Sequence, residues 1–152
     1  MKDTRRKRKV VFSLKNCQRK IRINCPQIMT TLKKNNLFFS TPPSYINVVI
    51  VSDNKIKKLN KEFLHKNTTT DVLSFKVSYQ EGEVIISAET AQQNALQYGF
   101  PVEYEIIYLI IHGYLHLRNY TDYTEKERTK MLKIQDRIFT KIIRNRKYES
   151  EQ

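Results

Sequence analysis

Apolar residues gather in four short runs whose patterns predict β-strands. Residues 45–51 (YINVVIV) are apolar almost throughout, which predicts a strand buried on both faces. Residues 71–77 (DVLSFKV) alternate in the manner of a strand. Two shorter β-prone runs, 10–14 and 83–87, complete the set, and we expect Glu81-Gly82 to form the turn before the last of them.

Helical periodicity and capping residues predict five helices. Asn24 and Ser52 each precede a helical segment as caps, and Thr124 with Glu127 forms a capping box. The segment 102–117 (VEYEIIYLIIHGYLHL) is apolar nearly all round, so we expect it to be a buried central helix. The predicted helices span 26–37, 53–63, 88–98 (ending at Gly99) and 102–117, and the last runs from Thr124 towards Arg146.

The order of these elements indicates one α+β domain over residues 1–152. A chain of 152 residues favours one domain, and its contents of 39% hydrophobic and 28% charged residues are typical of a globular protein. Residues 1–9 form a basic leader, whose order or disorder the sequence leaves open.

The charge of the chain predicts an anionic partner. Lys and Arg total 28 against 15 Asp and Glu, which gives a net charge of +13. The surplus lies at the two ends, while residues 23–125 are close to neutral. Nucleic acid is the first expectation and an acidic membrane surface the second. A basic tail that only confers solubility is the alternative.

The cysteines and the apolar runs bear on location. Cys17 and Cys25 lack a CxxC spacing, so we expect neither a disulfide-linked partner nor a cysteine zinc motif. No apolar run reaches the length of a membrane span, and no signal-peptide-like apolar segment follows the basic N-terminus. We therefore expect a cytoplasmic protein with no membrane partner.

Two of the three histidines lie four residues apart on the predicted central helix. His112 and His116 therefore share one helical face, and both imidazoles can reach a single metal ion. Imidazoles in an otherwise apolar helix need partners, because burying unpaired polar groups is costly. The alternative is a pair of core histidines bonded to backbone carbonyls.

A carboxylate follows the pair at a suitable distance. The segment from His112 to Asp122 has the form HxxxHxxxxxD, and the turn after Leu117 can bring Asp122 back over the histidines. Two imidazoles and one carboxylate leave a fourth position open, as catalytic zinc sites do. Alternatively, Asp122 faces solvent near the Thr124 cap.

Three blocks of residues together resemble the YbeY-type endoribonucleases, the bacterial rRNA maturation factors. The first is similar to the family's HGxLHLxGYDH, whose three histidines are metal ligands. The second is similar to its LN…TDVLSF, with the same spacing of ten residues between Asn and Thr, and the third is similar to GDIxI. The blocks are HGYLHL at 112–117 followed by Tyr120, LN at 59–60 with TDVLSF at 70–75, and GEVII at 82–86.

The chain departs from the family pattern at several positions. The family's third histidine corresponds to Asp122, the aspartate before it to Thr121, and the glycine of GYD to Asn119. Asp is a good zinc ligand, so metal binding is compatible with these changes. The family's arginine after LN corresponds to Leu64, which removes the natural candidate for neutralising charge in the transition state.

The resemblance implies a zincin-like fold, a four-stranded mixed sheet packed against helices with the metal at the end of the central helix. It also implies one Zn²⁺ ion bound by His112, His116 and Asp122, and a single-strand endoribonuclease that acts in rRNA maturation and small-subunit assembly. Its partners would be ribosomal RNA and the small ribosomal subunit. The alternatives are a non-catalytic RNA-binding assembly factor and a metalloprotease, but Gly113 stands where HExxH proteases carry their glutamate base.

Four further residues flank the motif blocks. Lys61, Lys66 and Arg118 are candidates for RNA contacts that replace the charge of the missing arginine. The alternative for each is a solvated surface cation. His65 lies beside the position of the missing arginine, and we expect it to be exposed and without a role, with contact to RNA as the alternative.

Overall fold

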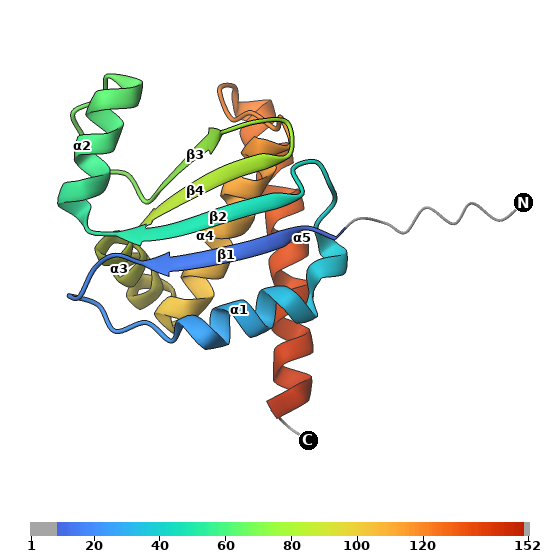
Figure 1. Ribbon diagram of the computed structural model, residues 1–152. Coiled ribbons are helices and arrows are strands. Elements are labelled where there is room, and N and C mark those ends of the chain that lie inside the picture. Colours follow the sequence, from blue (N-terminus) through green and yellow to red (C-terminus); the bar gives the residue numbers. More distant parts are fainter. Residues whose placement is uncertain (1–8, 151–152) are drawn as a thin grey trace, which may run out of the picture.

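The computed structural model describes residues 9–150, so the predicted basic leader, except for Lys9, lies outside the described residues (Figure 1). Five α-helices and four strands make up this part of the chain. In chain order they are β1 (Val11–Asn16), α1 (Cys25–Lys34), the 3-10 turn η1 (Asn36–Phe38), β2 (Tyr45–Val51), α2 (Asp53–Leu64), β3 (Val72–Lys76), β4 (Glu81–Ser87), α3 (Ala88–Tyr98), α4 (Val102–Leu117) and α5 (Glu125–Ser150).

The strands form one mixed sheet, as predicted. Their order is β1-β2-β4-β3. The first three are parallel, with Leu14 opposite Val48 and Val48 opposite Val84. β3 is antiparallel to β4 and forms one edge, which Figure 1 shows as the one arrow pointing the other way.

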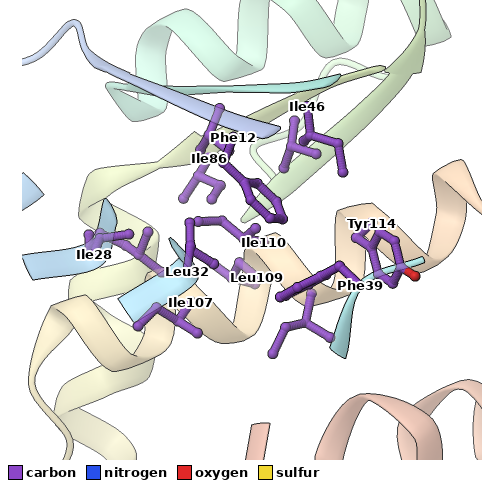
Figure 2. Close-up of a cluster of buried hydrophobic side chains, with 14 of the residues drawn as sticks. Phe12, Ile28, Leu32, Phe39, Ile46, Ile86, Ile107, Leu109, Ile110 and Tyr114 are labelled. Carbon is purple, nitrogen blue, oxygen red and sulfur yellow. The ribbon is translucent and has the colours of Figure 1, made fainter. Parts of the chain in front are cut away.

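The main hydrophobic core lies between one face of this sheet and helices α1, α3, α4 and α5 (Figures 1 and 2). Alternate strand residues point into it because successive side chains of a strand face opposite sides. α4 crosses the middle of this core and buries eleven of its sixteen residues, which confirms the predicted central helix. Figure 2 labels Phe12, Ile46 and Ile86 from the sheet with Ile28, Leu32, Phe39, Ile107, Leu109, Ile110 and Tyr114.

A smaller cluster covers the other face of the sheet. Ile56 of α2 packs there against Val51, Leu73 and Ile85. The expectation that residues 45–51 are buried on both faces is therefore correct on this face only for Val51, because Asn47 and Val49 stay half-buried and Tyr45 is exposed. The second cluster is too small to cover the whole strand.

Local capping determines where several helices begin and end. The side chains of Asn24 and Ser52 each accept a hydrogen bond from the backbone N–H three residues ahead. Thr124 and Glu127 form the predicted capping box, each accepting from the other's backbone N–H. Gly99 ends α3 with a φ of +71°, a conformation that glycine adopts without strain.

The turn before β4 does not lie at Glu81-Gly82. The N–H groups of Val77 and Ser78 both donate to the Glu81 carbonyl, so the turn comes earlier and Gly82 lies inside β4. A Cβ at Gly82 would lie 2.5 Å from Leu117 Cδ1 of α4. Close packing of a helix against the strand, rather than a turn, accounts for this glycine.

Helix α1 ends earlier than the predicted residue 37. The Asn35 side chain donates to the Thr31 carbonyl at 2.8 Å and accepts from Asn145 of α5 at 2.8 Å. This bond to a distant helix stabilises the end of α1 at Lys34, and η1 follows. Among the described residues, no helix combines the length and hydrophobicity of a membrane span.

Candidate metal centre

Helix α4 presents two imidazole rings on one face. His112 and His116 are one helical turn apart, and their Nε2 atoms are separated by 3.1 Å. The side chains are 24% and 28% exposed, so the pair lies at the edge of the core and within reach of solvent.

The partners of the Nδ1 atoms determine which nitrogen of each ring carries the proton. His116 Nδ1 lies 3.0 Å from the Tyr120 carbonyl, which can only accept. His112 Nδ1 lies 3.1 Å from Gln135 Oε1, and the amide nitrogen of Gln135 donates to the Tyr108 carbonyl at 3.1 Å. The Gln135 oxygen therefore accepts from His112. Both Nδ1 atoms are protonated, and both Nε2 lone pairs are free to bind a metal.

Two free lone pairs this close fit a shared cation. Zinc binds imidazole nitrogen at about 2.0–2.1 Å, so two tetrahedral nitrogen ligands lie about 3.3 Å apart. The observed Nε2 separation of 3.1 Å is close to this value. A shared proton is the other way to relieve the repulsion, but burial lowers the pKa of His112 and so disfavours the protonated ring.

Asp122 reaches the histidines because the chain reverses directly after α4. Asn119 adopts a φ of +72°, and the Tyr120 N–H donates back to the Leu115 carbonyl at 3.0 Å. Asp122 Oδ2 then lies 3.5 Å from His116 Nε2 and 4.0 Å from His112 Nε2. The structure thus brings together the three residues proposed from the sequence, with their ligand atoms all within 4.8 Å of one another.

The donor set suits a catalytic rather than a structural ion. Two imidazoles and one carboxylate can hold a divalent metal and leave a fourth position for water or substrate. Asp122 is 38% exposed, so this position is reached from solvent.

Gly113, between the two histidines, lets α4 approach the sheet closely. A Cβ there would lie 2.7 Å from both Cγ atoms of Val84 and 3.0 Å from Ser74 Oγ. The Ser74 hydroxyl donates to the Gly113 carbonyl at 3.3 Å. The position therefore has no room for the glutamate of an HExxH motif.

Two supporting groups were missed in the sequence. Tyr120 acts through its backbone carbonyl, which no sequence pattern indicates. Gln135 could have been found from the sequence, because it is a polar residue on the apolar face of α5 that also carries Met131 and Ile142. It is 2% exposed. A polar residue at a core position requires a partner, and its partner is His112.

The three cations proposed for RNA contacts lie in two places, at the end of α2 and at the end of α4. Lys61 lies on α2, where with Lys57 and Lys58 it lines a shallow hollow. Lys66 follows the end of that helix and is exposed. Arg118 caps α4, donates to the Pro42 carbonyl at 2.8 Å and lines a different pocket with Lys76. The structure does not gather them into one site.

The comparisons with known proteins agree on one family. The family model for endoribonuclease YbeY matches residues 4–143. A relative from Endomicrobium trichonymphae named endoribonuclease YbeY is 41% identical over 96 residues, covering 62% of this chain and 68% of that protein. One of the same name from Phytoplasma australiense is 36% identical over 130 residues, covering 80% and 85%.

A solved structure supports the fold. The solution structure of a Thermotoga maritima protein matches with a TM-score of 0.62 and 24% identity, covering 93% of this chain and 96% of that chain. Since the family model spans most of the sequence and the relatives match over much of their length, the chain belongs to the endoribonuclease YbeY family.

Proposed function

We propose that this protein is a zinc-dependent endoribonuclease that cleaves single-stranded RNA, with one Zn²⁺ held by His112, His116 and Asp122. Membership of the endoribonuclease YbeY family supports the activity. The observation that carries the proposal is the pair of unprotonated Nε2 atoms 3.1 Å apart, with a carboxylate oxygen beside them.

Two groups of residues form the proposed site: one binds the ion, and the other orients the residues that bind it. The two imidazoles and the Asp122 carboxylate bind the ion, and Gln135 and the Tyr120 carbonyl hold the rings in the correct tautomer. When bound, zinc supplies Lewis-acid chemistry, polarising a phosphoryl oxygen and lowering the pKa of water. Nitrogen and carboxylate ligands in a site of this size suit zinc.

The absence of a side chain at Gly113 favours a nuclease over a peptidase. The glutamate base of an HExxH peptidase would occupy this position, and Val84 leaves no space for it.

Cleavage of a phosphodiester also needs positive charge near the phosphate. Leu64, at the end of α2, stands where the family carries an arginine and is 46% exposed. We propose that Lys61, Lys66 and Arg118 provide part of this charge. Their exposed or pocket-lining positions support contact with RNA, from the end of α2 for Lys61 and Lys66 and from the end of α4 for Arg118.

We further propose that the substrate is ribosomal RNA, and that the protein acts in the cytoplasm during assembly of the small ribosomal subunit. The family resemblance implies this role. The net charge of +13 supports a polyanionic partner, and the free thiols of Cys17 and Cys25 suit a reducing compartment.

One observation, Leu64 at the position of the family's arginine, favours a second function, that of a non-catalytic protein. A chain that has lost the arginine and kept the scaffold would act as a non-catalytic RNA-binding assembly factor. Both functions bind RNA and metal, so only cleavage separates them.

The test is cleavage of a labelled single-stranded RNA by the zinc-loaded protein. We expect His112→Ala to abolish cleavage and zinc binding together. The matched control is His65→Asn, which removes a histidine from the end of α2 at a left-handed position that Asn tolerates. His65→Asn should cleave like the parent protein. Zinc binding without cleavage by the parent would overturn the nuclease proposal in favour of the assembly factor.

A further inference from the structure

Helix α5 carries a row of exposed cations along its outer side. The residues are three or four positions apart, so the helix repeat brings them into one line. All are exposed, and we call them the basic ridge. The basic ridge comprises Lys126, Lys130, Lys133, Arg137, Lys141 and Arg144.

The ridge is narrow, long and of one sign. At about 100° per residue, the six side chains lie within an arc of about 80°, and 18 residues of helix span about 27 Å. The buried residues Met131, Gln135 and Ile142 lie on the opposite side of α5. Figure 1 shows α5 running past the sheet and beyond α1, and the burial of the residues shows that the six ridge side chains are exposed along it.

The acidic residues of the same helix do not neutralise the ridge. Between residues 125 and 146, the three acids all lie outside its arc. Glu127 is bonded to the backbone of the capping box, and Asp136 accepts from the Tyr108 hydroxyl at 2.7 Å. Glu125 stands at the start of the helix, at one end of a shallow hollow lined by the first four ridge cations.

The chemistry of the ridge fits a nucleic acid strand better than a lipid surface. A helix that lies on a membrane needs an apolar face beside its cations. Among the described side chains of α5, the exposed large apolar residue is Leu132, which lies about 100° or more of rotation from the ridge. Ile134, which lines the hollow beside the ridge, is half-buried and offers little apolar surface. Aromatic rings stand beside the cations instead, with Lys130 Nζ 5.9 Å from the Tyr120 ring centre and Lys141 Nζ 5.7 Å from that of Phe38.

The spacing of the ridge matches a polyphosphate chain. Neighbouring cations are about 4.5–6 Å apart along the helix axis. Phosphates on one strand of a duplex are about 3.4 Å apart along the axis, and an unstacked single strand is longer per phosphate. A single strand can therefore place a phosphate near each cation.

The same helix is joined to the metal centre at two points. Gln135 bonds to His112 from the buried side of α5. Tyr120, beneath Lys130, provides the carbonyl that orients His116. A strand that follows the ridge towards the start of α5 is thereby led to the loop that carries Asp122.

We propose that the basic ridge of α5 is a track for the backbone of single-stranded RNA that delivers the strand to the metal centre. The direction of delivery rests on the proposed function, whereas binding to the ridge does not.

The test measures binding of a fluorescein-labelled 20-nucleotide single-stranded RNA by anisotropy, using the full chain without added metal. The triple variant Lys126→Gln, Lys133→Gln, Arg137→Gln removes three ridge charges and keeps helix propensity. Each lost phosphate contact lowers the salt slope by about 0.7, so the slope of log K against log salt should fall by about 2. At 0.1 M salt this corresponds to about 100-fold weaker binding.

The matched control removes the same charge elsewhere. The triple variant Lys15→Gln, Arg19→Gln, Arg22→Gln changes exposed cations of β1 and of the segment between β1 and α1. Figure 1 places that segment on the far side of the molecule from α5. We expect the control to keep the parent slope, and thermal melting of both variants verifies their folding.

The outcomes separate the ridge from the proposed function. Equal losses in the two triple variants, or an unchanged slope in the ridge variant, would overturn the proposal. The proposal would also be overturned if the ridge variant lost binding to phosphatidylserine vesicles and kept its RNA binding, because the ridge would then be a membrane-binding surface. RNA binding is measured without metal, so it is independent of cleavage. If the parent protein does not cleave RNA but the ridge variant loses RNA affinity, only the proposed nuclease activity is contradicted. If the parent protein cleaves RNA but the ridge variant binds it as before, only the proposed role of the ridge is contradicted.

Discussion

The amide oxygen of Gln135 lies 3.1 Å from His112 Nδ1, and this bond connects α5 to the metal centre on α4. The glutamine is 2% exposed, and its amide nitrogen is bonded to the Tyr108 carbonyl. Its orientation is thus defined from both ends, which gives His112 one tautomer.

Replacing Gln135 should therefore weaken metal binding. We expect Gln135→Leu to lower zinc affinity by about 10- to 100-fold, the usual cost of losing such a supporting bond. Gln135→Glu keeps an acceptor and should retain most of the affinity. Zinc titration against a competing chelator measures both, with the exposed Gln93→Leu of α3 as control. Parent-like affinity in Gln135→Leu would show that the ring needs no such partner.

Asp122 should contribute both affinity and metal preference. We expect Asp122→Ala to lose zinc affinity markedly, and Asp122→His to retain it because imidazole is also a zinc ligand. The carboxylate oxygen suits harder ions, so the ratio of manganese to zinc affinity should be lower in Asp122→His than in the parent. Competitive metal titrations measure that ratio. Zinc binding by Asp122→Ala at parent strength would mean that Asp122 is only a polar residue near the helix cap.

Gly113→Ala should destabilise the protein although alanine favours helices. The gain in helix propensity is about 1 kcal/mol. The new Cβ would meet both Cγ atoms of the fully buried Val84 at 2.7 Å, so rotating that side chain brings no relief. Overpacking of this kind costs about 1–3 kcal/mol, and we expect a net loss in urea unfolding. In a Val84→Ala background, Gly113→Ala should cost less than it does in the parent protein, because the clashing methyl groups are gone. If the losses in free energy of unfolding of the two single variants simply add in the double variant, residue 113 and Val84 are not in contact.

Glu105 should make stability depend on pH. Glu105 lies on α4 and is 6% exposed. Burial raises its pKa to about 7. The hydrogen bond from Asn94 lowers this pKa, and the negative charge of Asp71 raises it. The pKa of Glu105 in the folded protein exceeds the unfolded value of 4.5. Its contribution to the free energy of unfolding is therefore fully present below pH 4.5 and is lost as the pH rises through 7.

The variant Glu105→Gln keeps an acceptor for Asn94 and removes the titration. Two and a half pH units correspond to about 3 kcal/mol, so at pH 8 the variant should be more stable than the parent by up to about that amount. At pH 4 the two should be nearly equal. Urea unfolding with a chelator present, which removes any contribution from bound metal, measures the difference. A constant difference from pH 4 to pH 8 would mean that Glu105 does not titrate in this range.

Much of the fold was predictable because its signals are local. The helix over 102–117 and the strand over 45–51 have the predicted limits, since periodicity and flanking Pro or cap residues act within a few positions. The capping box at Thr124 likewise acts within one turn. Where a distant contact decides, the prediction failed. The predicted turn at Gly82 is wrong because that glycine packs against Leu117, 35 residues away, and the predicted extension of α1 past Asn35 is wrong because Asn35 bonds to α5.

The candidate site divides in the same way. The spacing of His112 and His116 on one helix determined their pairing, because the helix repeat alone brings them together. Asp122 could also be proposed from the sequence, because the left-handed turn at Asn119 that brings it back lies within a few residues of His116. The partners of the imidazole protons, by contrast, are Gln135 of another helix and the Tyr120 carbonyl. Tertiary packing alone decided these contacts, because a residue pattern records which faces are apolar but not which polar atoms meet when those faces close.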